Sequence, residues 1–221
     1  TLVRAKKYRK VLNHPEAVTV WYSNKSLRQL TNIQRSITEI EDKQQRNFFE
    51  LCFSNVVRKV SYADPSISVP VHWNPDRFSG HPERMNEIRR KLQQLETVDV
   101  YDKFEVVCKS NIDRIDTLKG HIRNGLTARI ISDDARKLGL ESNSVDMILT
   151  SPPYAGAQKY IRASWLNLYW LNRVKIEDIR ELKTHNIGRE DYRKEEVYES
   201  YTGIEAADIV LKDLYKNGNT T

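Results

Sequence analysis

The stretch Ser144-Val145-Asp146-Met147-Ile148-Leu149-Thr150-Ser151-Pro152-Pro153-Tyr154 decides the fold that the sequence predicts. Its first half is a short apolar run, and its length and composition are typical of a buried strand in a parallel sheet. The two prolines end the run, because proline has no backbone N–H and keeps the preceding residue out of helical geometry. We therefore expect a stiff, extended loop at the carboxyl end of a strand, where open α/β sheets bind their ligands.

This predicted loop carries groups that suit a flat base with an exocyclic amine. The Ser151 hydroxyl and the carbonyls of Pro152 and Pro153 can accept hydrogen bonds from an amino group, and the Tyr154 ring can stack on a base taken out of a duplex. Hydrogen bonds that strengthen as the nitrogen becomes tetrahedral favour the transition state. The residues therefore indicate transfer to an amine without a covalent enzyme intermediate. The alternative is a proline-rich turn after a buried strand.

A second strand is expected over residues 127–131, and it ends in Ser132-Asp133-Asp134-Ala135. At the end of a strand, Asp134 can accept from the amine of a bound nucleoside while Ala135 offers its N–H. Taken alone, the two aspartates are also typical of a turn or a helix cap. A short helix over residues 136–140 is then expected to lead into the strand before Ser151.

These two motifs, in this order and at this separation, resemble those of the S-adenosylmethionine-dependent DNA amino-methyltransferases. That family moves a methyl group to the exocyclic amine of adenine or cytosine, in bacteria often within restriction–modification systems. Thr150-Ser151-Pro152-Pro153-Tyr154 is similar to its catalytic motif, and the serine spelling favours cytosine N4 over adenine N6. The resemblance implies base flipping, S-adenosylmethionine as cofactor and double-stranded DNA as substrate.

The resemblance also implies roles for individual residues. Ser151, Pro152, Pro153 and Tyr154 would be catalytic, and Asp133, Asp134 and Ala135 would bind the cofactor's adenine. The family often has a Tyr-x-Arg segment after the motif, so nucleic acid is expected at Lys159, Tyr160 and Arg162.

The fold implied is α/β, a partial Rossmann-like methyltransferase core with a large helical insertion. The core would start within residues 1–24, where residues 1–10 read as a basic helix and residues 18–22 as a short strand or an apolar linker. The insertion would fill residues 25–125 with helical patterns over 26–64 and 82–118, separated by a proline-rich loop at 65–82. Residues 126–221 would complete the core, with further helices at 161–171, 176–184 and 204–217.

Composition is consistent with this interpretation without requiring it. The net charge of +6 suits a polyanionic partner, although 30% charged residues also suit solvated helices. Arg84, Arg89, Arg90 and Lys91 line one polar helix side, which indicates a solvated face or, less often, a phosphate track. No apolar run approaches the ~20 residues that span a bilayer, so no membrane partner is expected.

The cysteines and histidines point to no separate chemistry. Cys52 and Cys108 lie far apart within apolar helical patterns, which predicts buried free thiols in a reducing compartment. We therefore expect a cytoplasmic, nucleoid-associated protein. The five histidines show no metal-ligand spacing, so no metal is expected.

The resemblance stops at the cofactor loop. The eight glycines never form the close-set loop that lets a backbone approach S-adenosylmethionine. The chain would be a truncated enzyme, a split enzyme whose partner chain supplies the loop, or a degenerate homologue that binds without catalysing. Two further alternatives for function follow: methylation of an RNA base amine, and a non-catalytic DNA-binding or specificity subunit of a split methyltransferase.

Overall fold

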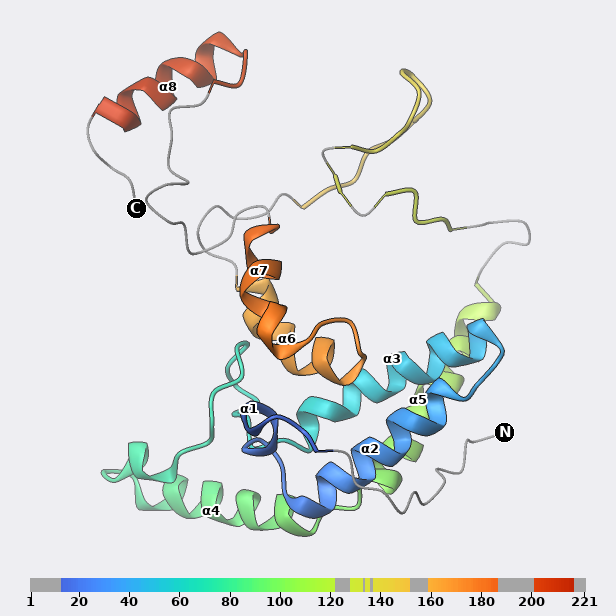
Figure 1. Cartoon of the computed structure of the whole chain (residues 1–221), viewed down its shortest axis with the longest axis vertical. Coiled ribbons are helices and arrows are strands. Elements are labelled where there is room, and N and C mark those ends of the chain that lie inside the picture. The colour runs from blue at the N-terminus through green and yellow to red at the C-terminus, as the bar shows by residue number, and fades with distance from the viewer. Residues whose placement is uncertain are drawn as a thin grey trace.

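The computed structural model describes residues 13–121, 128–132, 134–135, 137–151, 159–186 and 201–216. Figure 1 shows these residues as helices joined by connecting segments. The described residues contain no β-strand, and their one isolated β-bridge joins Ala63 to His72 in antiparallel orientation. The expected α/β Rossmann-like core is therefore wrong for the described part of the chain, which is helical. The expected helix over residues 1–10 lies outside the described residues.

The helical pair predicted over residues 26–64 is confirmed. Helix α2 (Asn24–Thr38) begins after Ser23, whose hydroxyl accepts from the Ser26 N–H at 3.1 Å. Helix α3 (Lys43–Lys59) begins after Asp42, whose carboxylate accepts from the Gln45 N–H at 2.7 Å. Each cap satisfies an amide that the first helical turn leaves without a partner. The apolar stripe that predicted α2 is buried, at Leu27, Leu30, Ile33 and Ile37.

The long helical pattern from Pro82 to Leu118 is confirmed as two helices. Helix α4 (Pro82–Thr97) has proline at its first turn, and helix α5 (Val100–Lys119) follows at once. Asp99 causes the break, because its carboxylate accepts from the Tyr101 and Asp102 N–H groups at 2.9 and 3.3 Å. The proline-rich stretch before α4 forms the expected loop, with one short 3-10 turn, η1 (Pro75–Phe78).

The remaining helices come from both ends of the chain. Residues 18–22, expected as a strand or linker, instead form the end of α1 (Glu16–Thr19) and a turn. The helix expected over 161–171 is α6 (Tyr160–Trp170), and the one over 176–184 is η2 (Ile176–Asp178) with α7 (Ile179–Thr184). Helix α8 (Glu205–Lys216) matches the last prediction and lies apart from the other helices in Figure 1.

One core holds most of these helices together, and we call residues 13–121 and 159–186 the helical body. Trp170 at the end of α6 is fully buried, with ring centroids of Tyr22 at 5.8 Å and Phe53 at 6.1 Å. Phe53 on α3 in turn contacts Phe104 on α5 at 6.4 Å. The core therefore joins residues from all three segments into which the sequence divided the chain.

The motif segment, which we define as the described residues between 128 and 151, has no such packing. Ile130 is 96% exposed and Leu149 is 89% exposed, although both were expected in buried strands. The prediction fails because a strand needs a neighbouring strand for its backbone groups and its side chains, and the described residues provide none. Residues 137–140 are also not helical, contrary to the helix expected over 136–140. No helix among the described residues is long and apolar enough to cross a bilayer.

Candidate functional site

Ser151 is the only residue of the predicted catalytic set that lies within the described residues. It ends the motif segment, is exposed, and follows the exposed residues Ile148 and Leu149. Pro152, Pro153 and Tyr154 lie outside the described residues. An exposed hydroxyl can accept a hydrogen bond from an amine that approaches from solvent.

The predicted adenine-binding residues lie in a turn that Ser132 organises. The Ser132 hydroxyl accepts from the Asp134 N–H at 3.1 Å and lies 2.8 Å from the Lys137 carbonyl, to which it donates. The Lys137 N–H donates to the Asp134 carbonyl at 3.0 Å. This is the local side-chain-to-backbone pattern that serine favours over regular structure. Asp134 is half-buried, Ala135 is exposed, and Asp133 lies outside the described residues.

The three residues expected to contact nucleic acid lie together at the start of α6. Lys159 precedes the helix, Tyr160 begins it with 44% of its surface exposed, and Arg162 is half-buried in its first turn. Their helix is held by Leu166 and Trp170, both in the core. The predicted contact residues therefore belong to the helical body, whereas Ser151, Asp134 and Ala135 belong to the motif segment.

A cavity of about 700 Å³ lies elsewhere, between residues 13–15, the middle of α2 and the chain after α6. His14 forms one wall: its Nε2–H donates to the Thr31 hydroxyl at 2.7 Å, and its Nδ1 accepts from the Tyr169 hydroxyl at 2.8 Å. This tautomer follows because the Thr31 hydroxyl donates its single hydrogen to the Leu27 carbonyl. The motifs did not point to this cavity, because residues far apart in the sequence form its walls: His14 and Tyr169, which share a hydrogen bond there, are 155 positions apart.

His14 and Tyr169 stay neutral in a cavity wall that also carries the charged residues Arg173, Lys175, Glu177 and Asp178. Burial, and then the nearby Arg35 guanidinium, lower the pKa of His14 below its usual value, and burial raises the pKa of the Tyr169 hydroxyl. Gln34 is fixed beside them, since its amide donates to the Trp170 carbonyl at 2.5 Å and to the Asn172 carbonyl oxygen at 3.2 Å. The cavity is thus lined by neutral hydrogen-bonding groups and by charged side chains, and its size fits small molecules.

The two cysteines lie deep in the core on facing helices, as free thiols. The Asn111 amide donates to the Cys52 sulfur at 3.3 Å. The hydrogen bond with Cys52, together with burial, raises the pKa of Cys108, so this thiol stays neutral. Among the described residues, no group of three or more histidine, cysteine or acidic side chains gathers where it could hold a metal ion.

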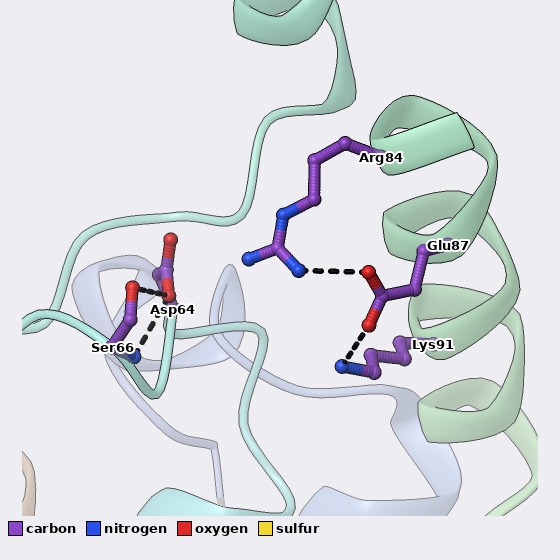
Figure 2. A network of polar contacts seen from close by, with 5 residues as sticks. All are labelled: Asp64, Ser66, Arg84, Glu87 and Lys91. Atoms are coloured by element: carbon purple, nitrogen blue, oxygen red, sulfur yellow. Dashed lines mark hydrogen bonds and ion pairs between the residues drawn. The ribbon is translucent and has the colours of Figure 1, made fainter. Parts of the chain in front are cut away.

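Three charged side chains of α4 form a network within the helix, shown in Figure 2. Glu87 accepts from Arg84 at 2.8 Å and from Lys91 at 2.6 Å, and both cations lower the pKa of its carboxyl. Arg84 also lies over the Phe78 ring and Lys91 over the Trp73 ring, at 5.8 and 5.3 Å from the centroids. Two of the four cations expected on this helix side, Arg84 and Lys91, thus pack on aromatic rings of the preceding loop.

Comparison with known proteins adds no relative. No family model matches the chain, and neither the curated proteins nor the solved structures contain a match.

Proposed function

We propose that this chain contributes the catalytic segment of a DNA methyltransferase that modifies the exocyclic amine of a flipped base, with cytosine N4 favoured over adenine N6. The observation that carries the proposal is the ordered pair of motifs, Ser132-Asp133-Asp134-Ala135 and Thr150-Ser151-Pro152-Pro153-Tyr154. The exposure of Ser151 supports it, because an amine can reach the hydroxyl from solvent. The position of Lys159 and Tyr160 at the start of α6, a helix anchored in the core a few residues after the motif, supports a nucleic-acid contact there.

In this proposal the residues act by positioning. The Ser151 hydroxyl and the Pro152 carbonyl accept from the two hydrogens of the base amine, and they direct its lone pair outward. The Tyr154 ring stacks on the flipped base. These hydrogen bonds strengthen as the nitrogen becomes tetrahedral, so they stabilise the transition state more than the ground state.

The proposed cofactor is S-adenosylmethionine, which when bound supplies the methyl group. Asp134 and Ala135 have the groups that adenine requires: a carboxylate that accepts from the amine, and an N–H that donates to a ring nitrogen. The exposed position of Ala135 and the hydrogen-bonded turn at Ser132 fit such a contact. A partner chain with a glycine-rich loop would complete the rest of the cofactor site in a split enzyme.

The test is methyl transfer from labelled S-adenosylmethionine to duplex DNA, by the chain alone and with any chain that co-purifies. Ser151→Ala is expected to lower turnover by about 100-fold, as loss of one positioned polar group does in other transferases and hydrolases. Ser144→Ala is the matched control, because Ser144 lies in the same segment and donates to the Glu141 carbonyl. Unchanged turnover in Ser151→Ala would remove the proposed mechanism.

Two other outcomes would replace the proposal. Transfer to RNA in preference to DNA would make the chain an RNA base methyltransferase. Duplex binding with neither methyl transfer nor cofactor binding, under both conditions, would make it a non-catalytic DNA-binding subunit.

A further inference from the structure

Helix α4 lies at the edge of the helical body with one face open. It packs on η1 and on α2, and Ile88 is its one fully buried residue (Figure 1). The side chains that face inward or sideways, Arg84, Glu87 and Lys91, are engaged in the network of Figure 2. Arg84 and Lys91 also lie over the Phe78 and Trp73 rings of the preceding loop, and these contacts hold the helix against that loop. Its 16 residues extend over about 24 Å.

The open face of α4 has an unusual composition. Positions three and four residues apart share a helix face, and the exposed residues over its middle turns are two arginines and three amides. They are Asn86, Arg89, Arg90, Gln93 and Gln94. Arg89 lies 3.8 Å from the Asp76 carboxylate, in a pair that is open to solvent on both sides. Of the acidic residues of the helix itself, Glu83 occupies the first turn and Glu96 accepts from the Tyr62 hydroxyl near the other end. Glu87 lies between them, and its carboxylate is paired with Arg84 and Lys91.

Helix α5 has an exposed side of different composition in the same protein. It carries charges that pair along the helix, Lys109 with Glu105 at 2.6 Å and Lys119 with Asp116 at 2.8 Å. Such pairs are typical of a surface selected for solubility and helix stability. It also carries exposed apolar residues, namely Val106, Ile112, Ile115 and Leu118. The exposed middle of α4 differs in carrying no large apolar side chain: each of its five residues ends in an amide or a guanidinium that can form more than one hydrogen bond.

We propose that the outer face of α4 reads the sequence of double-stranded DNA from the major groove. The groove is wide enough for an α-helix. Arginine pairs with the O6 and N7 acceptors of guanine, and asparagine and glutamine pair with the N6 and N7 edge of adenine, so the five residues are those that distinguish bases there. This inference rests on the proposed function, for which it supplies the surface that selects the target site.

The test is selection from a pool of short duplexes with a random central stretch, at one fixed salt concentration. The full-length chain is expected to enrich particular sequences. Arg90→Ala combined with Gln93→Ala is expected to reduce the preference for the enriched duplex over a scrambled one by about 5- to 150-fold for each base that the helix no longer reads. Arg90→Lys keeps the charge but lacks the forked donor, so it should retain overall affinity while selectivity falls.

The control is Gln44→Ala combined with Arg114→Ala, which removes an exposed glutamine and an exposed arginine from α3 and α5. It should select the same sequences as the unchanged chain. Circular dichroism checks that each variant keeps its helices, which is expected because Arg90 and Gln93 are exposed.

Three results would overturn the inference: unchanged selectivity in the α4 variants, no duplex preference in the unchanged chain, or preference for RNA. Methyl transfer is measured on the same pool of duplexes. This measurement distinguishes a failure of the α4 inference from a failure of the proposed methyltransferase function. Methylation with the same sequence profile in the α4 variants would refute only the role of α4. Selection that depends on α4, without methylation, would refute only the catalytic proposal.

Discussion

The helical body and the motif segment use similar apolar residues with opposite results. Leu30 and Trp170 in the body are fully buried, whereas Leu149 is 89% and Ile130 96% exposed in the motif segment. The difference lies in how each pattern finds partners. A helix satisfies most of its backbone hydrogen bonds within itself, so its apolar stripe needs only another surface to pack against. An apolar strand also needs neighbouring strands for its backbone groups.

The strongest test of this difference compares two large-to-small substitutions. Trp170→Ala should lower the free energy of unfolding by about 3–5 kcal/mol, because it leaves a large cavity among α2, α3 and α6. Leu149→Ala should change it by no more than about 0.5 kcal/mol, as exposed substitutions do. Urea unfolding followed by far-ultraviolet circular dichroism measures both. Equal losses would show that the motif segment is packed in solution.

A smaller effect concerns the junction of α4 and α5. Asp99→Ala should cost about 1 kcal/mol, because it removes the acceptor for the first amides of α5 and the partner of the Gln29 amide at 3.2 Å. Asp99→Asn, which keeps an acceptor at the cap, should retain most of this stability. A loss in Asp99→Asn as large as in the alanine variant would mean that the charge, and not the cap, stabilises the junction.

The smallest expected effect is a dependence of the free energy of unfolding on pH, and it comes from two histidines of the helical body. Burial lowers the pKa of His14 and of His72 below the usual 6.5, so each takes up its proton less readily when folded than when unfolded. The unfolded state then binds more protons below about pH 6.5, and stability falls as the pH decreases from there. His14→Gln can keep both hydrogen bonds and should flatten this decline in urea midpoints. An unchanged slope would assign the effect to other groups.

Much of the helical body could be predicted from the sequence. The helical patterns over residues 26–64 and 82–118 are present as α2 to α5, and Leu27, Leu30, Ile33 and Ile37 recur at helical spacing along the buried face of α2. The Asp42 and Asp99 caps begin α3 and α5, and aspartate directly before a helical pattern is a capping signal. Helical periodicity and helix caps depend on residues that are close together in the sequence, so a single sequence is enough to predict them.

The rest depends on contacts across the chain. The apolar run at Val145–Leu149 has no period that separates a buried strand from an exposed segment, so its burial was predicted wrongly. The cavity at His14 and Tyr169 could not be predicted, because the sequence around each residue carries no signal that the two side chains meet in the fold. Of the candidate site, the roles of Ser151, Asp134 and Ala135 stay predictions, and Asp133 and Pro152 to Tyr154 lie outside the described residues.

The place of Trp170 has a consequence for synthesis on the ribosome. Helices α2 and α3 are complete once Lys59 has been added, yet the indole that fills the space between them lies 111 positions later. At about 5–20 residues per second, that interval lasts roughly 5–20 s. During this time Phe53, whose ring lies 6.1 Å from the indole in the folded chain, lacks this partner. The nascent chain therefore exposes its future core for seconds, and chaperones that bind apolar surface would meet it there before α6 closes over it.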